Sequence, residues 1–409
     1  MRLTTPDTPT LSWPQTHTLG EQPQLRRKLE INYRRNRQQD QTAAIDAAAQ
    51  AFRYEDCRQE YWNPEPFSLL YGTPLWDQAS PSQRLVLNHL YWVAYYSQII
   101  SAEIATIFFN QTSAAGLYAQ EDFRLICDML DLESAQERAH IHAFQTVGRQ
   151  TEAALFGEGI FSYPQRGPFT ETMVFADSDR LRRGWKQLQL RSFGLLSAGN
   201  TFLACQYFTV RGVRTLNGKL VQHKLSTYYQ KHADPDRAPI PAKISYYHFL
   251  DESFHFNSST LLSHEVVNCL PPPTAFERWV ANLGLRGCQR DHYHFSAAIN
   301  GIFWYDPALY PAIYRVLRSP VFGLEAVEAR QMMIRCFTEE SDGLHHSYQT
   351  HQEALESYRA YVANLGFLWP SNREMSLMAA NSIPRYLQHQ RNKLRNFKFT
   401  GLLETEMDQ

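Results

Sequence analysis

The sequence contains no apolar run long enough to cross a membrane, and its first residues lack the apolar core of a secretory signal. It also has no CxxC pair, because its six cysteines are scattered along 409 residues. In a chain of this length, that pattern is typical of buried or free thiols in a reducing compartment, and not of a disulfide framework. We therefore expect a cytoplasmic protein without membrane segments.

Strand signals and net charge are also scarce. Alternating polar and apolar residues followed by hairpin turns are nearly absent, which argues against a β fold. The formal net charge is only -1, so bulk charge gives no reason to expect a nucleic-acid partner. Hydrophobic residues make up 44% of the chain and charged residues 20%, which is a globular composition. These features favour an all-α globular protein.

Long apolar-periodic segments predict four core helices. The first spans about 83–110 and has Ser82 as its cap, and the second spans about 121–155. The third begins near Asp179, runs to about 208 and is followed by a basic, polar stretch at 213–240. The fourth covers about 242–268 and ends before three consecutive prolines.

This pattern predicts a ferritin-like four-helix bundle core with additional peripheral helices. Residues 81–270 would form the core. Residues 1–80 would wrap around it, and residues 271–409 would add C-terminal helices packed on the core, all within one domain.

Two of the predicted core helices carry a Glu-x-x-His motif. Glu137 and His140 form one on the second helix, and Glu252 and His255 form the other on the fourth. A further histidine, His248, precedes Glu252 by four residues. Spacings of three and four residues place these side chains on one stripe of each helix. A single such motif often arises by chance on a solvated helix face, but two on separate helices are far more specific.

Glu103 stands alone within an apolar stretch of the first helix. Burying an unpaired carboxylate is costly, so Glu103 requires a compensating cation. Together with the two motifs it forms the dimetal carboxylate pattern of helical bundles, in which carboxylates bridge two cations and imidazoles fix each one. Asp251, directly before Glu252, resembles the aspartate that hydrogen-bonds the metal-bound histidine of the other motif.

The third helix lacks the acid that usually completes this pattern. No Asp or Glu occurs between residues 180 and 233, whereas ten Lys or Arg residues do. This basic stretch is either a solvated face or a docking patch for an acidic partner, with Arg182 and Arg183 as candidate contacts.

The order Glu, Glu-x-x-His, His-x-x-x-Glu-x-x-His over residues 80–270 resembles the aureothin-pathway p-aminobenzoate N-oxygenase family of dimetal oxygenases. His248 matches the extra histidine of that family. The family's spacing, counted from His140, implies a glutamate on the third helix where this chain has Gly199. Loss of that carboxylate resembles the dimetal-carboxylate halogenases of the cylindrocyclophane type, the CylC-like group.

This resemblance implies an oxygen-dependent halogenase that chlorinates an unactivated carbon of an acyl chain held on an acyl carrier protein. It implies two iron ions, with manganese or a mixed pair as alternatives, together with chloride, dioxygen and an external reductant. We expect chloride at an open position marked by Gly199, and we leave a homodimer open.

For the ligands, we expect Glu103, Glu137 and His140 on one ion, and His248, Glu252 and His255 on the other. Glu137 and Glu252 would be the bridges. Two other functions remain open. One is a dimetal N-oxygenase or hydroxylase acting on an amine or other small substrate, and the other is a metal-stabilised helical binding protein without turnover.

Overall fold

A computed structural model describes residues 18–161, 180–232, 234–299, 305, 307–374 and 382–399. Within these ranges every regular element is a helix, which confirms the all-α prediction. The longer helices are α1 (Pro23–Gln38), α2 (Thr42–Ala51), α5 (Pro81–Leu117), α6 (Arg124–Phe156), α7 (Arg180–Ala198), α8 (Thr201–Gln230), α9 (Ile240–Thr260), α10 (Ala275–Ile299), α11 (Tyr310–Arg318), α12 (Ala326–Thr338), α13 (Asp342–Val362) and α15 (Ile383–Arg395). Short helices α3 (Tyr54–Cys57) and α4 (Pro74–Gln78) lie between α2 and α5.

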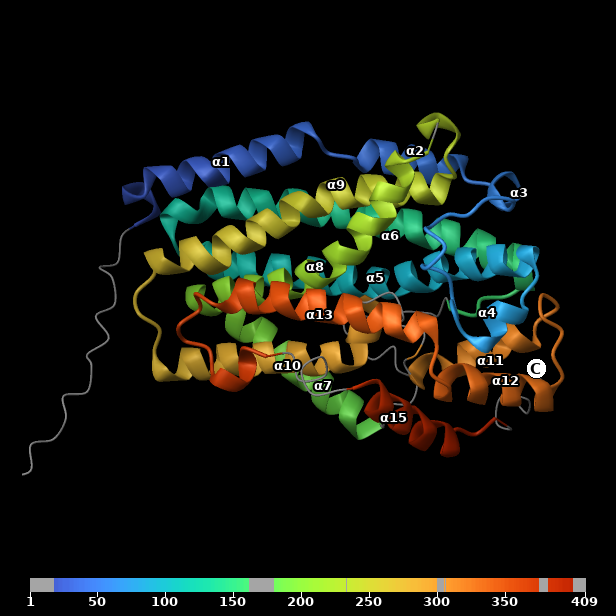
Figure 1. Cartoon of the computed structure of the whole chain (residues 1–409). Coiled ribbons are helices and arrows are strands. Elements are labelled where there is room, and N and C mark those ends of the chain that lie inside the picture. The colour runs from blue at the N-terminus through green and yellow to red at the C-terminus, as the bar shows by residue number, and fades with distance from the viewer. Residues whose placement is uncertain are drawn as a thin grey trace, which may run out of the picture.

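The helices α5, α6, α8 and α9 form the centre of the molecule and run roughly along one axis (Figure 1). α5 packs against both α6 and α8, and α8 packs against α9. α5 and α8 are antiparallel, because Thr201 at the start of α8 donates to the carbonyl of Gly116 near the end of α5. At the other end of the pair, the side chain of Gln222 on α8 lies beside the Tyr95 hydroxyl of α5.

The first core helix begins two residues earlier than the sequence suggested. Its cap is Ser80, whose side chain accepts a hydrogen bond from the backbone of Gln83, and not Ser82. Pro81 explains the difference, because proline is favoured at the first helical position, where its missing N–H has no partner to lose. α5 is 37 residues long and ends at Leu117, beyond the predicted end near residue 110.

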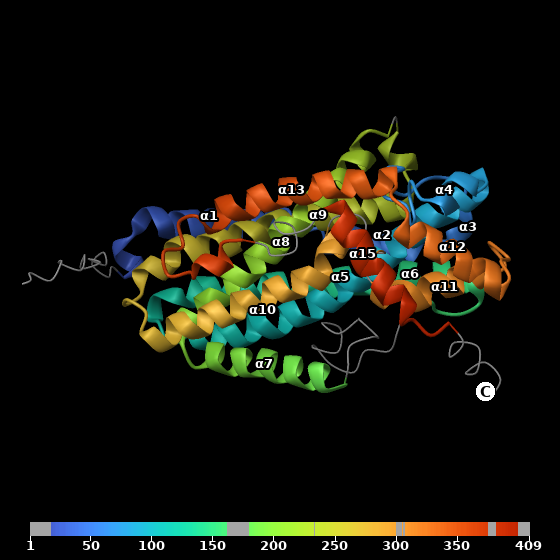
Figure 2. The ribbon, with the colours of Figure 1, turned by 60° about the horizontal axis from the view of Figure 1, so that its bottom comes forward.

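The predicted third helix is two helices. α7 ends at Ala198, and α8 begins at Thr201 after a cap by Asn200, whose side chain accepts from the backbone of Leu203. α8 runs on to Gln230, so most of the basic, polar stretch at 213–240, which was not assigned to a core helix, is helical. Asp179, the predicted cap of this helix, lies outside the described residues. The third core helix is therefore α8, whereas α7 lies against the outside of α5 and α8 (Figure 2).

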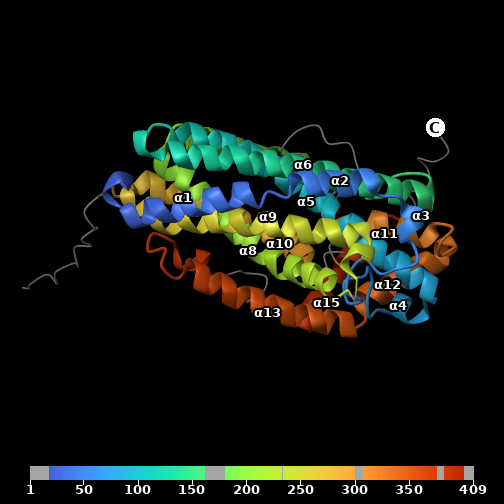
Figure 3. The same cartoon turned by 90° about the horizontal axis from the view of Figure 1, so that it is seen from above.

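The remaining helices cover this core. α1 and α2 extend over α6 and α9, as Figure 3 shows from above. α10 and α13 pack against α8. No helix in the described ranges combines the length and the apolar character that a membrane crossing requires.

Candidate metal centre

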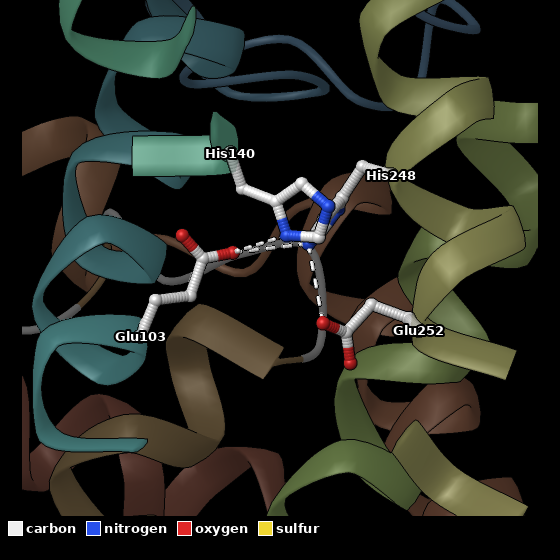
Figure 4. Close-up of side chains that lie close together, drawn as sticks. All are labelled: Glu103, His140, His248 and Glu252. Atoms are coloured by element: carbon white, nitrogen blue, oxygen red, sulfur yellow. Dashed lines mark hydrogen bonds and ion pairs between the residues drawn. The ribbon is translucent and has the colours of Figure 1, made fainter. Parts of the chain in front are cut away.

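Carboxylate and imidazole side chains from three core helices converge inside the bundle. Figure 4 shows Glu103 from α5, His140 from α6, and His248 and Glu252 from α9 pointing toward one another. The first three are at most 4% exposed, and the Glu252 side chain is 12% exposed. These residues lie on three different helices, as the sequence predicted, and the fold brings them together.

The first group comprises Glu103, His140, His248 and Glu252. The Nε2 atom of His248 lies 3.1 Å from Oε1 of Glu103 and 3.6 Å from Oε1 of Glu252. The Nδ1 atom of His140 lies 3.6 Å from the same Glu103 oxygen. One ligand atom from each of the four residues falls within 4.8 Å of the others, which is compact enough for a single metal ion.

The second group comprises Glu137, Glu252 and His255. The Nδ1 atom of His255 lies 3.1 Å from Oε1 of Glu252 and 3.3 Å from Oε1 of Glu137. The other Glu137 oxygen lies 3.5 Å from Nδ1 of His140, in the first group. Glu137 and Glu252 thus each contact histidines of both groups, which is the arrangement that bridging carboxylates require.

The grouping of His248 differs from the sequence-based assignment. We expected His248 beside His255, but the structure places it with Glu103 and His140. The reason lies in helix geometry, because His248 precedes Glu252 by about one turn of α9 and His255 follows it by about one turn. The two histidines therefore lie on opposite sides of the Glu252 carboxylate. The second group is left with a single histidine.

Each Glu-x-x-His histidine is oriented by a residue from the other motif. The Nε2 atom of His140 lies 3.1 Å from Oδ2 of Asp251, the contact predicted from the sequence. The Nε2 atom of His255 lies 2.9 Å from the side-chain oxygen of Gln136. Both histidines therefore direct Nδ1 toward the carboxylates, where it is free to bind a metal. Gln136 was not predicted from the sequence, although it directly precedes Glu137 as Asp251 directly precedes Glu252.

The cluster concentrates negative charge in a buried place. Burial raises the pKa of Glu103, even though the nearby imidazoles of His140 and His248 favour its charged form. Burial opposes a charged His255, yet the carboxylates of Glu252 and Glu137 hold its pKa well above the ordinary value. The site therefore attracts positive charge, which protons supply in the absence of any other cation.

Several buried polar atoms in the cluster have no hydrogen-bond partner within the described part of the chain. They are one oxygen each of Glu103 and Glu137, and the Nδ1 atoms of His140 and His248. Leaving such atoms unsatisfied is costly, whereas metal ions would satisfy the carboxylate oxygens and Nδ1 of His140. Nitrogen and oxygen donors of these types suit iron, manganese or zinc. The residues thus fit a pair of metal ions.

Gly199 does not belong to this cluster. It lies in the turn between α7 and α8, and its neighbour Ser197 contacts Gly116 of α5. Gly116 follows Glu103 by thirteen residues on the same helix, which corresponds to about 20 Å along the axis. The spacing of Gly199 from His140 predicted a place on the third core helix at the level of the candidate ligands, but the break before α8 moves Gly199 to the end of the bundle.

A different glycine, Gly218 of α8, lies at the level of the cluster. Arg211 and Gln222 stand seven residues before it and four residues after it, so all three share one face of α8. That face points inward, because Arg211 contacts the backbone of His255 and Gln222 contacts Tyr95. Gly218 is buried, yet among the described residues an added Cβ would meet only the side-chain nitrogen of Gln222, at 3.8 Å. It is therefore the candidate on α8 for the carboxylate-free position expected at Gly199.

Arg211 and Glu133 form a buried ion pair beneath the cluster. Their side chains meet at 2.6 Å and are 5% and 1% exposed. Arg211 also donates to Asn110, to Ser259 and to the backbone carbonyl of His255. Arg211 is one of the ten basic residues between 180 and 233, but its burial excludes it from a docking surface. The side chains of Arg182 and Arg183 lie outside the described residues, so their role stays a prediction.

The fold and the cluster together define a helical carboxylate–histidine protein with a site suited to two metal ions. A family model described as "Acyl halogenase CylC-like" matches residues 24–398. The chain therefore belongs to the CylC-like acyl halogenase family, as the sequence motifs indicated. Searches of curated proteins and of solved structures find no match.

Proposed function

We propose that this protein is an oxygen-dependent dimetal halogenase, which replaces a hydrogen on an unactivated aliphatic carbon of a carrier-bound acyl chain by chlorine. Family membership supports the halogenase activity. The observation that carries the rest is the asymmetry of the two ligand groups. One has two histidines, whereas the other has only His255 with two shared carboxylates, and a buried glycine takes the place of a third acid.

Glu103, His140 and His248 would hold one ion, His255 would hold the other, and Glu137 and Glu252 would bridge them. When bound, such a pair supplies reduction of dioxygen, abstraction of a hydrogen atom from the substrate and transfer of chlorine to the carbon radical. Asp251 and Gln136 hold the Nε2 protons of His140 and His255, which fixes the neutral forms that can bind metal.

The reaction also needs an external reductant. Reduction of dioxygen to two waters takes four electrons, and conversion of a C–H bond and chloride to a C–Cl bond releases two. The other two electrons therefore come from outside the protein. We propose iron for the site because its two common oxidation states suit this exchange, with manganese or a mixed pair as the alternatives.

Chloride would occupy the space beside Gly218. An anion is electrostatically favoured there, because the ion held by His255 has lost a carboxylate relative to the usual pattern. A glutamate at this position would fill the space and supply the same negative charge. The side chain would enter without a severe clash, since the end of Gln222 is the one neighbour that a Cβ would meet in the described part of the chain.

The test is product analysis of Gly218→Glu in chloride buffer, with an acyl chain loaded on its carrier protein. We expect metal binding to survive and chlorinated product to disappear. Gly218→Gln has the same size without the charge, and Gly199→Glu places the same charge at the far end of the bundle. Chlorination by Gly218→Glu at the wild-type level would refute the halide position. Turnover of an amine or a hydroxylated product from the wild type, with no halogenated product, would favour the oxygenase alternative.

A further inference from the structure

A row of buried aromatic side chains leads away from the candidate metal centre. The ring of Tyr96 lies 5.8 Å from the ring of His248, measured between centroids. Trp92 lies 4.4 Å from Tyr96, and Trp62 lies 6.1 Å from Trp92. Tyr96, Trp92 and Trp62 are each at most 1% exposed. The row is therefore shielded from solvent along its whole inner part.

The row ends near the surface at a tyrosine–histidine pair. Tyr54 lies 6.0 Å from Trp62, and His89 stacks on Trp62 at 4.2 Å. The Nε2 atom of His89 lies 2.8 Å from the backbone carbonyl of Glu60, which can only accept a hydrogen bond. Nδ1 of His89 is therefore the acceptor for the Tyr54 hydroxyl at 3.2 Å. Tyr54 is 8% exposed and its chain neighbour Glu55 is exposed.

The chemical type of these rings is more specific than core packing requires. Tyrosine and tryptophan are among the side chains that lose an electron most readily, whereas phenylalanine resists oxidation. Phe144 packs on Tyr96 at 4.1 Å, which shows that a phenylalanine ring satisfies the packing requirements of this region. Each member of the row also has a partner for its polar atom. Trp92 and Tyr96 both donate to Ser245, at 2.9 Å each.

We propose that the row Tyr96, Trp92, Trp62 and Tyr54 is an electron path that discharges the oxidised metal centre when no substrate is ready to react. This inference rests on the proposed oxygen-dependent function. One electron moves inward along the row, and Tyr54 supplies it at the outer end. The phenolic proton of Tyr54 passes to Nδ1 of His89, which leaves a neutral tyrosyl radical and an imidazolium.

The hydrogen bond between Tyr54 and His89 makes the transfer of the phenolic proton feasible. Burial lowers the pKa of His89 to about 4, so the imidazole is neutral near neutral pH and its Nδ1 lone pair is available. A one-electron reductant such as ascorbate then restores Tyr54 from the surface. Because tyrosine and tryptophan yield electrons only to strong oxidants, the path protects the centre and does not serve for its ordinary reduction.

The first experiment maps oxidised side chains by mass spectrometry after iron-loaded protein meets dioxygen without acyl substrate. Uptake of dioxygen is measured first, because its absence would refute the proposed function and not the path. We expect oxidation at Trp62 and Tyr54 in the wild type. In Trp92→Phe, which keeps an aromatic ring, oxidation at these sites should fall several-fold and rise at Tyr96. Trp76→Phe is the control, since Trp76 is a buried tryptophan that packs on Tyr71 and Arg84 instead.

The second experiment tests the path without metal redox chemistry. A ruthenium photo-oxidant attached at Glu55→Cys of zinc-loaded protein would inject the oxidising equivalent at the surface. We expect oxidation of Tyr96 in the parent and its loss in Trp92→Phe, while Trp62 still reacts. If Trp92→Phe fails to fold, Tyr96→Phe replaces it, because that substitution removes only a hydroxyl group. The expected result is then loss of the radical signal at residue 96. Equal patterns in the path variant, the Trp76→Phe control and the parent in both experiments would overturn the proposal.

Discussion

His255 donates its Nε2 proton to the side-chain oxygen of Gln136 at 2.9 Å, and this bond mirrors the one between His140 and Asp251 across the cluster. Each Glu-x-x-His motif thus orients the histidine of the other motif through the residue just before its own glutamate. Gln136 is itself held by Asn36, which accepts from its amide nitrogen at 2.8 Å. The amide orientation is therefore fixed by two partners. The two motifs form one mutually supported unit and not two separate half-sites.

Removal of the Gln136 acceptor should weaken metal binding. In Gln136→Leu, His255 loses the partner that fixes its ring, so we expect a loss of about 10- to 100-fold in metal affinity. The measurement is a competition titration with a chelator of known affinity. Gln145→Leu, on the same helix, is the matched control because Gln145 bonds to Arg149 and not to the cluster. An affinity equal to that of the control would show that the Gln136 bond has no role in holding the metal.

The number of metal ions bound per chain should depend more on Glu252 than on any other ligand. It belongs to both ligand groups, so its loss removes a donor from each ion. Elemental analysis of iron-loaded wild type should give about two equivalents per chain, and Glu252→Ala should lose most of that metal. Glu265→Ala, which removes a carboxylate paired with Lys28 at the surface, should keep it. Full metal content in Glu252→Ala would exclude the bridging role.

The carrier-protein hypothesis predicts a salt-sensitive contact at α7. Arg182→Glu combined with Arg183→Glu should weaken association with an acidic carrier and reduce the dependence of binding on ionic strength. Turnover of a small diffusible thioester analogue should change less. Exposed Arg34 and Arg37 of α1, reversed in the same way, are the control for overall charge. Unchanged turnover of the carrier-bound substrate at low salt would assign Arg182 and Arg183 to an ordinary solvated face.

His89 should make folding sensitive to acid. Its pKa is lowered from 6.5 to about 4 in the folded chain by burial, so the unfolded chain takes up this proton first as the pH falls. The contribution of the neutral imidazole to the free energy of unfolding is complete above pH 6.5. It is lost as the pH falls from 6.5 to about 4. The full loss corresponds to about 3 kcal/mol.

The corresponding measurement is denaturant unfolding of wild type and His89→Gln across this pH range. Glutamine can still donate to the carbonyl of Glu60 but does not titrate. The variant should be less stable near neutral pH because it loses the packing of the ring on Trp62. The difference in free energy of unfolding between wild type and His89→Gln should decrease as the pH falls. A difference in free energy of unfolding that stays constant would show that the pKa of His89 is the same in the folded and unfolded chains.

The sequence alone determined the helical class and six of the residues that meet at the centre. Helical periodicity is a local property, and a Glu-x-x-His spacing places two side chains on one face whatever surrounds the helix. The contact between Asp251 and His140 also followed, because the residue before a bridging glutamate points to the neighbouring helix in this pattern. These features need no knowledge of where the helices lie.

Only the tertiary structure decided which candidate ligands lie together and which glycine lies at their level. His248 joins Glu103 because α5 and α9 meet at a level that the sequence does not encode locally. Gly218 lies at the level of the cluster and Gly199 does not, since the chain breaks at Asn200 and α8 then runs antiparallel to α5. The helix break and this register depend on caps and contacts with residues far apart in the chain. Counting along the sequence could not supply them.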